Sequence, residues 1–459
     1  RASQWMEENI PLFECSQKNF EEMYYYRWWT LRKHIKETPV GYGMTEFLVN
    51  RSYADKYNLI ACAIGHHIYE SRWLRNPEYL NQIIHTWYRG NEGGPMAKMT
   101  KFSSWNADAV LGRYMVDGNK EFLLDMVKDL EAEYARWEKT NRLPNGLYWQ
   151  GDVQDGMEES ISGGRRKQYA RPTINSYMYG NAKALSLIGI MTGDEGMAMK
   201  YGLKADSIKT LVQDKLWNTD HHFFETMRGD ASAEVREAIG YIPWYFNLPD
   251  ASSKYTVAWK EVMDEKGFSA PYGLTTAERR HPEFRTHGVG KCEWDGAIWP
   301  FASAQTLTAM ANFMNNYPQT VLTDSVYFHQ MERYVESQHH RGRPYIGEYL
   351  DEVTGYWLKG DQERSRYYNH STFNDLMITG LIGLRPRMDN TVEVNPLIPE
   401  GKWDYFCLDN VLYHGRNLTI LWDKDGSRYQ RGKGLHIYVD GKEVGHADTL
   451  TRVLCENVL

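Results

Sequence analysis

In the stretch "NKEFLLDMVKDLEAEYARWEKT" (residues 119–140) apolar residues recur at helical spacing, and this pattern is the basis of the fold that we expect. Phe122, Met126, Leu130 and Ala132 fall on one face of a helix, and charged residues occupy the opposite face. A second stripe of the same kind is formed by Leu59, Cys62, Ala63 and His66. The pattern predicts amphipathic helices that bury one face each.

Such helices are expected all along the chain from residue 17 to about 385, with loops of very different lengths between them. The predicted helices lie near residues 17–37, 54–72, 77–90, 104–117, 119–140, 173–192, 195–216, 233–245, 252–265, 296–315, 323–340 and 370–383. Twelve helices in one domain favour six helical hairpins closed into a double ring, an (α/α)6 toroid. The predicted fold class is therefore mainly α, with a small C-terminal β-rich region.

The pattern changes after about residue 388, where apolar and polar residues begin to alternate. The alternating segments are "TVEVNPLIP" (391–399), "DYFCLDNVLYHGRNLTILWD" (404–423) and "KGLHIYVDGKEV" (433–444). The Asp-Gly pairs at 425–426 and 440–441 are typical of hairpin turns. We predict a catalytic barrel at 1–387 and a β-rich subdomain at 388–459 that packs on it.

Charge and composition exclude several classes of protein. The chain has 53 Lys and Arg against 60 Asp and Glu, so it lacks the basic excess of a nucleic-acid binder. No apolar run approaches the roughly 18 residues of a membrane helix, so no membrane partner is expected. The five cysteines are scattered and form no CxxC pair, which disfavours a disulfide framework or a zinc site. We expect no metal and no cofactor.

The aromatic content points to the kind of ligand. Aromatic residues make up 14% of the chain, with 32 Tyr and 16 Trp against 15 Phe. Tyr and Trp combine an apolar face with a polar tip, and a surface that stacks on sugar rings uses them. A large Tyr-rich core explains the same composition, so the choice depends on the loops.

The longest predicted loops are expected to gather at one mouth of the barrel, where loops of such length are usually functional. They span residues 38–53, 141–172, 217–232, 266–295 and 341–369. Hydrolysis of a glycoside needs two carboxyl groups on opposite sides of the bond, one to donate a proton and one to activate water or attack. The candidates are therefore carboxylates in aromatic, glycine-rich loops.

The first such loop is "WQGDVQDGMEESISGG" (149–164). Asp155 and Glu158 lie three residues apart, with Trp149 and Met157 as apolar neighbours. An apolar neighbour raises the pKa of a carboxyl and keeps it protonated near neutral pH. The alternative is a solvated acidic turn.

The second loop is "PYIGEYLDEVTGYW" (344–357), in which Glu348 precedes Tyr349 and further aromatic residues follow. A polar turn is again the alternative, but exposed rings are unfavourable unless a ligand or another segment covers them. Glu348 is therefore the second candidate carboxylate.

Three further segments supply candidate substrate-binding residues. In "CEWDGAIWPFASAQTL" (292–307) the candidates are Trp294, Asp295 and Trp299, with Asp295 alternatively a helix cap. "RPTINSYMYGNAKAL" (171–185) and "YYNHSTFNDLMITGLIGLRP" (367–386) are polar helix starts. Their candidates are Arg171, Asn175, Tyr177 and His370, of which His370 is alternatively a buried structural histidine. Trp149 and Tyr349, in the two carboxylate loops, are candidate substrate-binding residues as well.

In this order, the segments resemble the six-hairpin glycosidases, the clan of trehalases, glycoside hydrolase family 63 and mannosylglycerate-hydrolase-like proteins. "DGMEES" resembles the segment with the general acid, which implies that role for Glu158. "GEYLDEVTG" resembles the segment with the general base, which implies that role for Glu348, and "WDGAIWPFASAQ" resembles a sugar-binding segment. The resemblance spans about residues 17–390 and implies an inverting mechanism. The acid of this clan is usually Asp, so Asp155 is the alternative acid.

The expected function is an exo-acting glycoside hydrolase that removes a terminal α-linked sugar, with an α-glucoside ahead of an α-mannoside and an α-L-rhamnoside. The partner is an oligosaccharide or glycoside substrate. The alternatives are a phosphorylase, an epimerase or a lyase on the same barrel, or a carbohydrate-binding protein without catalysis. The chain opens at Arg1 without an initiator Met, so we expect a processed or trimmed form and favour a periplasmic or extracellular location over the cytoplasm.

Overall fold

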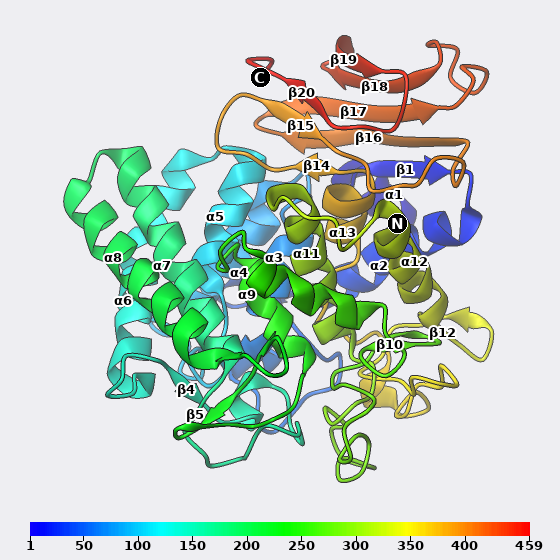
Figure 1. Ribbon diagram of the computed structural model, residues 1–459. Coiled ribbons are helices and arrows are strands. Elements are labelled where there is room, and N and C mark those ends of the chain that lie inside the picture. Colours follow the sequence, from blue (N-terminus) through cyan, green and yellow to red (C-terminus); the bar gives the residue numbers. More distant parts are fainter.

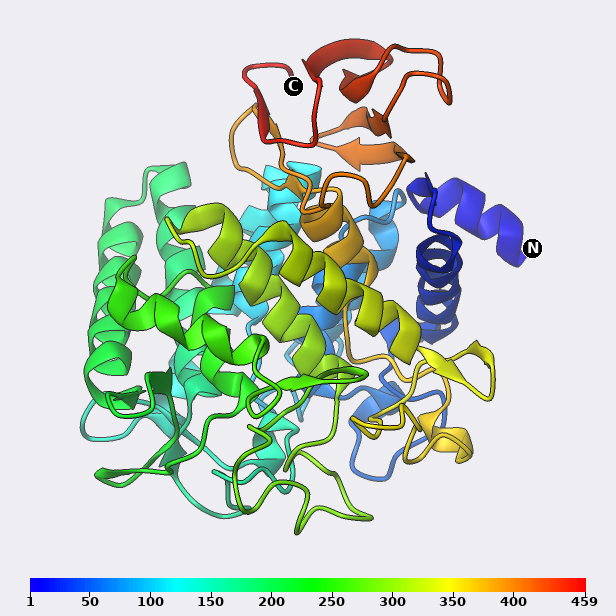
Figure 2. The same ribbon diagram turned by 45° about the vertical axis from the view of Figure 1, so that its right-hand side comes forward.

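The computed structural model describes residues 1–459. Its body is a group of packed helices, and an antiparallel sheet from the C-terminal part of the chain lies across one end of that body (Figure 1). Loops and short two-residue strands occupy the other end of the helices, as the turned view in Figure 2 also shows. A mainly helical protein with a C-terminal β region is thereby confirmed.

The helices account for the predicted helical segments, and several of them are shorter than expected. They are α1 (Ala2–Asn9), α2 (Lys18–His34), α3 (Ile64–Ser71), α4 (Pro77–Arg89), α5 (Asn106–Asp117), α6 (Lys120–Asn141), α7 (Pro172–Thr192), α8 (Glu195–Leu211), α9 (Ile242–Tyr245), α10 (Ser253–Thr256), α11 (Pro300–Asn316), α12 (Asp324–Ser337) and α13 (Asn374–Leu376). Short 3₁₀ or π turns extend α3, α8, α9, α10 and α13 at Ala61–Ala63, Val212–Leu216, Ala238–Tyr241, Val257–Val262 and Met377–Leu381. Three further 3₁₀ turns lie in loops, at Lys56–Asn58, Val153–Asp155 and Glu363–Ser365.

Helix α6 shows why these segments are helical. The Asn119 side chain accepts a hydrogen bond from the Phe122 backbone N–H at 3.0 Å and so caps the first turn. The buried stripe runs along Leu123, Met126, Leu130, Tyr134 and Trp137. The predicted stripe is correct at Met126 and Leu130, whereas Ala132 is exposed.

The predicted helix 54–72 is wrong over its first half, because regular helix begins only at Ile64. Tyr57 and Asn58 adopt φ near +62°, which a right-handed helix cannot contain. The Asn58 side chain donates to the backbone carbonyls of Phe47 and Val49 at 3.0 and 3.2 Å. These bonds tie residues 47–58 into a loop instead of a helix. Helix α1 and the first strand were not predicted.

The strands lie in one five-stranded sheet, one four-stranded sheet of short strands (β4-β5-β8-β9), one three-stranded sheet and four two-stranded ribbons. They are β1 (Leu12–Cys15), β2 (Ile35–Thr38), β3 (Gly41–Met44), β4 (Trp149–Gln150), β5 (Tyr169–Ala170), β6 (Trp217–Asn218), β7 (Phe223–Phe224), β8 (Met227–Arg228), β9 (Ala231–Ser232), β10 (Ser269–Ala270), β11 (Gly273–Leu274), β12 (His339–His340), β13 (Arg343–Pro344), β14 (Leu384–Arg385), β15 (Val392–Val394), β16 (Tyr405–Tyr413), β17 (Arg416–Asp423), β18 (Gly434–Val439), β19 (Lys442–Ala447) and β20 (Val453–Cys455).

The large sheet has the order β1-β16-β17-β18-β19 and is antiparallel throughout. The predicted turn at Asp440-Gly441 joins β18 to β19 with both residues at positive φ, as a type I′ turn requires. His414 and Gly415 form the equivalent turn between β16 and β17, which the Asp-Gly pattern does not predict. Asp425 and Gly426 lie in the longer β17–β18 connection.

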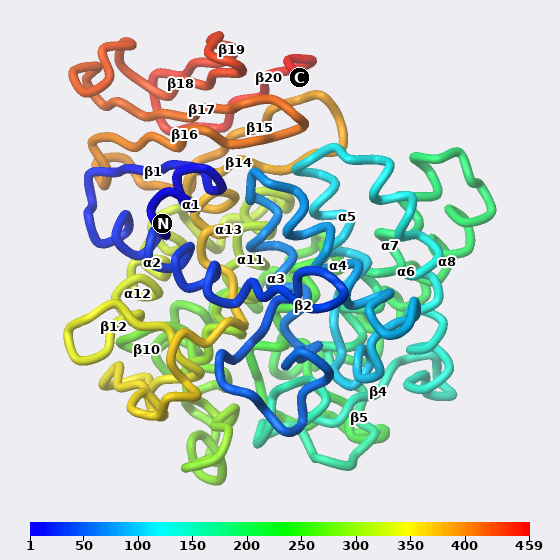
Figure 3. Tube along the Cα trace, turned by 180° about the vertical axis from the view of Figure 1, so that it is seen from behind, coloured from blue at the N-terminus to red at the C-terminus, as the bar shows by residue number.

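The N-terminal strand belongs to the C-terminal sheet, since β1 pairs with β16 (Figure 3). Trp403, which precedes β16, packs against Phe13, Phe20 and Phe328, with ring centroids 6.1, 5.3 and 5.7 Å away. These rings come from β1, α2 and α12 and join the sheet to the helical body in one continuous hydrophobic core. No helix of the chain is long and apolar enough to span a membrane.

Candidate active site

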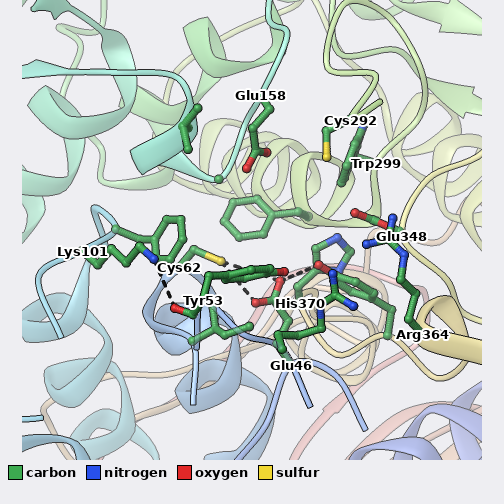
Figure 4. A pocket seen from close by; sticks show the side chains of 17 residues that line it. Glu46, Tyr53, Cys62, Lys101, Glu158, Cys292, Trp299, Glu348, Arg364 and His370 are labelled. Carbon is green, nitrogen blue, oxygen red and sulfur yellow. Dashed lines mark hydrogen bonds and ion pairs between the residues drawn. The ribbon is translucent and has the colours of Figure 1, made fainter. Parts of the chain in front are cut away.

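Three carboxyl groups from distant parts of the chain, Glu46, Glu158 and Glu348, line one pocket of about 330 Å³. Figure 4 shows Glu158 on one wall and Glu46 on the facing wall, with Glu348 to the side next to Arg364. The pocket is lined by Glu46, Arg51, Tyr53, Ile60, Cys62, Lys101, Phe102, Val153, Gly156, Glu158, Cys292, Trp299, Phe301, Glu348, Arg364, Tyr368 and His370. The structure therefore brings together the two carboxylates singled out in the sequence, and it adds a third.

Glu158 follows a tight turn that starts after β4. Residues Val153–Asp155 form a 3₁₀ turn that Gly156 ends at φ +70°, and the Met157 side chain is fully buried in the core. Burial raises the pKa of Glu158 to about 7, and the nearby charge of Glu348 acts in the same direction. Glu158 is thus protonated in a substantial fraction of molecules near neutral pH.

Trp149, expected beside the acid, lies elsewhere. It borders a separate surface hollow with Gln150 and residues 165–168, and it does not line the carboxyl pocket. The apolar lining of the carboxyl pocket includes instead Phe102, Val153 and Trp299.

Glu348 sits in a different electrostatic environment from Glu158. Its Oε2 lies 3.6 Å from Lys359 Nζ and 3.9 Å from an Arg364 nitrogen, and Glu348 and Lys359 are both buried. The Glu348 backbone N–H donates to Ser365 Oγ at 3.3 Å, which fixes the loop. Oε2 accepts no hydrogen bond from the protein. Two cations thus compensate a carboxylate whose oxygen is available to a ligand or to a water molecule.

Glu46 was not identified from the sequence. It follows β3 and is 3% exposed, and its Oε1 accepts a hydrogen bond from the Tyr368 hydroxyl at 2.9 Å. Cys62 Sγ lies 3.4 Å from Oε2. Burial raises the pKa of Glu46 to about 8, while the bonds from Tyr368 and Cys62 act in the opposite direction. The only signal in the sequence was its place in the long loop 38–53.

Asp155, the alternative acid, lies outside the pocket lining. Its carboxylate accepts a hydrogen bond from Arg171 Nε at 2.7 Å and from Thr173 Oγ1 at 2.5 Å, and Ser103 Oγ donates to its other oxygen. Asp155 and Arg171 are both fully buried. This ion pair holds the turn before Glu158 against the start of α7, and it occupies Arg171, which we had expected to bind substrate.

The aromatic wall of the pocket is layered. Trp299 lines the pocket, and Tyr349 and Trp294 each stack on it, with ring centroids 4.6 and 4.7 Å away. Asp295 accepts hydrogen bonds from the backbone N–H groups of His287 and Gly288 at 3.0 and 2.8 Å. Of these predicted residues only Trp299 borders the pocket, and the others support it.

Asn175 and Tyr177 lie behind the wall and make structural bonds. Asn175 exchanges two hydrogen bonds of 2.8 Å with the backbone of Tyr148, and the Tyr177 hydroxyl accepts one from Gln305 at 2.8 Å. His370 does line the pocket, and neither of its ring nitrogens has a hydrogen-bond partner. Burial lowers the pKa of His370 well below its usual value, so the ring is neutral.

Two basic residues of the pocket have no carboxylate partner. Lys101 Nζ bonds only to the Tyr53 carbonyl at 3.1 Å, and Arg51 packs on the rings of Phe47 and Tyr53 with its Nε unpartnered. Neither residue could be singled out in the sequence beyond its place in a loop. They make one side of the pocket mouth positive.

One group of possible metal ligands lies outside the pocket, formed by His221, Glu225 and Glu234. Both ring nitrogens of His221 are already engaged, with Glu225 at 2.5 Å and Glu234 at 3.3 Å. The cluster is therefore satisfied internally, and the pocket itself does not involve it.

Residues 56–371 match the family described as mannosylglycerate hydrolase MGH1-like glycoside hydrolase domain. Residues 384–446 match the glycosyl hydrolase family 65 C-terminal domain. The first match contains Glu158 and Glu348, and the second contains most of the large sheet.

Among solved structures, one named sialidase is 85% identical over the whole of this chain, with a TM-score of 0.99. The present chain covers only 42% of that protein's length. The family 63 mannosylglycerate hydrolase from Thermus thermophilus in complex with glucose is 11% identical, with a TM-score of 0.55 over 78% of this chain and 99% of that one. The family 78 rhamnosidase of Bacillus sp. GL1 is 10% identical, with a TM-score of 0.60 over 91% of this chain and 40% of that one. The two distant matches concern the fold alone.

Proposed function

The chain belongs to the mannosylglycerate hydrolase MGH1-like glycoside hydrolases, and from that premise we propose that it removes a terminal α-linked sugar with Glu158 as general acid and Glu348 as general base. The observation that carries the proposal is the meeting of these two carboxyls in one buried pocket, with a proton favoured on the first and two cations beside the second. A pocket of about 330 Å³ suits the end of a glycan better than its middle.

The acid role follows from the environment of Glu158. No basic side chain lies within ion-pair distance of its carboxyl, and burial favours the neutral form. A carboxyl with a pKa near the working pH can hold a proton in the ground state and release it to the departing oxygen.

The base role follows from the environment of Glu348. Lys359 and Arg364 compensate its charge, and Oε2 has no hydrogen-bond donor in the protein. That oxygen can accept a proton from water as the water attacks the anomeric carbon. We propose an inverting mechanism, which requires roughly 6.5–9.5 Å between the carboxyl groups. We propose that the first anomer released has the opposite configuration to the substrate, which NMR of fresh product tests directly.

We also propose an architecture for the chain. Six helical hairpins of an (α/α)6 toroid form a catalytic region at 1–387, and residues 388–459 form an appended subdomain. The antiparallel packing of consecutive long helices, such as α7 and α8, supports this arrangement. The pairing of β1 with β16 means that the N-terminus contributes to the appended sheet.

An α-glucoside leads the proposed substrates, followed by an α-mannoside and an α-L-rhamnoside. The name sialidase belongs to a protein more than twice as long as this chain, so it assigns no sugar to the barrel. Arg51 and Lys101 favour a leaving group that carries a carboxylate, since they line the pocket without an acidic partner. Mannosylglycerate, in the name of the Thermus enzyme, is a glycoside of that kind. We favour a periplasmic or extracellular location for such an enzyme.

The first experiment is a hydrolysis screen on aryl glycosides that covers both anomers and both ring sizes, each with and without phosphate. A need for phosphate would indicate a phosphorylase, and an absorbing unsaturated product would indicate a lyase. Product sugar with neither signal supports hydrolysis. Binding without turnover on every substrate would support a carbohydrate-binding protein.

The second experiment compares Glu158→Gln and Glu348→Gln with Glu159→Gln as the matched control. Glu159 is adjacent in sequence but turns towards Arg165, His287 and Lys291, at 3.6–3.7 Å. We expect each of the first two to lose about 10²–10⁴-fold in kcat, and the control to keep wild-type activity. Glu158→Gln should recover on a dinitrophenyl glycoside, whose leaving group needs no proton, whereas Glu348→Gln should not. Wild-type rates in Glu158→Gln on natural glycosides would refute the acid assignment.

A further inference from the structure

Glu46 is a buried pocket carboxyl that the acid–base pair does not use. Its backbone is pinned to the segment before α13, because Asn369 donates from its backbone N–H to the Glu46 carbonyl at 2.9 Å and from its side chain to the Thr45 carbonyl at 3.0 Å. The Tyr368 hydroxyl fixes the orientation of the carboxyl through Oε1. A side chain held from two sides in this way presents its second oxygen, Oε2, in a defined position.

The surroundings of Glu46 favour a neutral carboxyl. No Lys, Arg or His nitrogen pairs with it, whereas Glu348 has two such partners. Three negative charges in one small buried pocket repel each other, and burial favours a proton on those without a cation. Burial indeed raises the pKa of Glu46 more than the Tyr368 and Cys62 bonds lower it. The titratable and charged groups that face Glu46 or share its pocket are Arg51, Tyr53, Cys62, Lys101, Glu158, Cys292, Glu348, Arg364, Tyr368 and His370.

A second observation indicates that a polar ligand binds between these groups. His370 is 3% exposed, borders the same pocket and has no hydrogen-bond partner on either ring nitrogen. Glu348 Oε2 is buried and equally unpartnered. Buried polar atoms are normally hydrogen-bonded, so several unpartnered ones around one space are typical of a site that a hydroxyl-rich molecule completes.

We propose that Glu46 binds the sugar held between Glu158 and Glu348, donating a hydrogen bond from its protonated carboxyl to a sugar hydroxyl. Oε1 accepts the Tyr368 hydroxyl, so Oε2 carries the donated proton. Neutral His370, with one donor and one acceptor nitrogen, binds a neighbouring hydroxyl of the same sugar. The inference rests on the proposed function and adds a third carboxyl that selects the sugar by its hydroxyl configuration.

The test uses the fact that an amide can replace a protonated carboxyl as a donor but cannot replace a carboxylate. Glu46→Gln should keep kcat/KM within about fivefold of wild type near pH 6, whereas Glu46→Ala should lose at least about 100-fold. Glu46→Met fills the same space without a donor, and it should lose as much as Glu46→Ala. Thermal unfolding of each variant shows which ones fold, and the comparison of Gln with Met stands even if the alanine variant does not.

A pH profile separates substrate binding from a structural role. Above about pH 8 the wild type loses two protons needed for turnover, from Glu158 and Glu46, so log kcat/KM should fall with a limiting slope of −2. For Glu46→Gln, log kcat/KM should fall with a limiting slope of −1, because only Glu158 then loses a needed proton. An unchanged slope, or a Gln variant as damaged as the Met variant, would overturn the inference.

The outcomes also separate this inference from the proposed function. If Glu158→Gln and Glu348→Gln lose activity as expected while Glu46→Gln matches Glu46→Met, only the role of Glu46 is wrong. If Glu158→Gln and Glu348→Gln both keep wild-type activity, the acid–base assignment fails and the inference with it. Glu159→Gln is the control in every series.

Discussion

The buried pair of Asp155 and Arg171 offers a direct test that separates the two candidate acids. Arg171 Nε donates to Asp155 at 2.7 Å, and their side chains are 1% exposed for Arg171 and 0% for Asp155. Asp155 also accepts hydrogen bonds from Thr173 and Ser103. Every polar atom of this carboxylate is therefore engaged inside the protein. We predict that Asp155→Asn and Asp155→Ala change stability far more than they change catalysis.

The magnitude follows from the charge that is left behind. Removing one partner of a buried ion pair leaves an uncompensated charge, at a cost of about 3–5 kcal/mol in the free energy of unfolding. Asp155→Ala, which also removes the acceptor for Thr173, should lie at the upper end of that range. Asp155→Asn keeps one acceptor oxygen and should lie at the lower end. Adding Arg171→Met to Asp155→Ala should restore only part of the loss, because it removes the unpaired guanidinium but also takes the cation away from buried Glu237.

The assay combines urea unfolding, followed by the fluorescence of the 16 tryptophans, with kcat measured at low temperature on the folded protein. We expect kcat per folded molecule to stay within about tenfold of wild type, the reduction coming from a looser turn at Gly156 and Met157. The reasoning would be refuted if Asp155→Asn were as stable as wild type and its kcat fell about 10²–10⁴-fold, which is the loss expected when a general acid is removed. That result would transfer the acid role to Asp155.

Three further predictions concern the pocket and the sheet. Between pH 4.5 and about 8 folded Glu46 keeps a proton that the unfolded chain has lost, so wild type loses stability as pH rises through this window. At about 1.4 kcal/mol per pKa unit, the free energy of unfolding of Glu46→Gln relative to wild type should rise by up to about 5 kcal/mol between about pH 4.5 and 8.5, as measured by urea unfolding. A difference between the two proteins that does not change with pH would contradict this. Arg51→Gln and Lys101→Gln should each reduce kcat/KM about tenfold for a glycoside with a carboxylate in its leaving group. Neither substitution should change kcat/KM for the neutral methyl ester of the same glycoside. Equal losses of kcat/KM on the acid and the ester would contradict a role in charge recognition. Deletion of residues 1–16 removes β1 and exposes the edge of β16, so it should lower the unfolding temperature and promote aggregation in a light-scattering assay, whereas Leu12→Lys at the exposed end of β1 should do neither.

Periodicity in the sequence predicted the long helices and the C-terminal strands because both patterns are local. Helix α6 needs only its own apolar spacing and its Asn119 cap, and β17 with β18 needs only alternation. Strand β1 could not be predicted in this way, since four residues carry little periodicity and its partner β16 lies near the other end of the chain. The helix predicted over residues 54–63 is wrong for a related reason. The Asn58 side chain donates to carbonyls of a different segment, and the spacing of apolar residues carries no information about such a bond.

The same distinction between local sequence features and tertiary contacts applies to the candidate site. Residue type and loop length located Glu158 and Glu348, but they also placed Trp149 and Arg171 in the site, whereas the fold uses these two in a separate hollow and in a buried ion pair. The sequence did not single out Arg51, Cys62 and Glu46 as pocket residues. They line the pocket only because the loop that follows β3 folds back onto Asn369.

The roles of the three pocket carboxyls illustrate why residue type alone does not assign chemistry. Glu46, Glu158 and Glu348 have identical side chains, and each is buried or nearly so. They differ in what the fold places beside them: two cations near Glu348, a tyrosine hydroxyl and a thiol at Glu46, and burial without an ion-pair partner at Glu158. A cation favours the charged carboxylate and burial without one favours the acid, so one pocket can hold a base and two proton carriers at the same pH. Exchanging the environments should therefore exchange the roles. Lys359→Met removes the nearer cation from Glu348 and should lower kcat, while Glu158 and the alkaline limb of the kcat profile stay in place. A shift of the alkaline limb would show that the carboxyls act as one coupled unit.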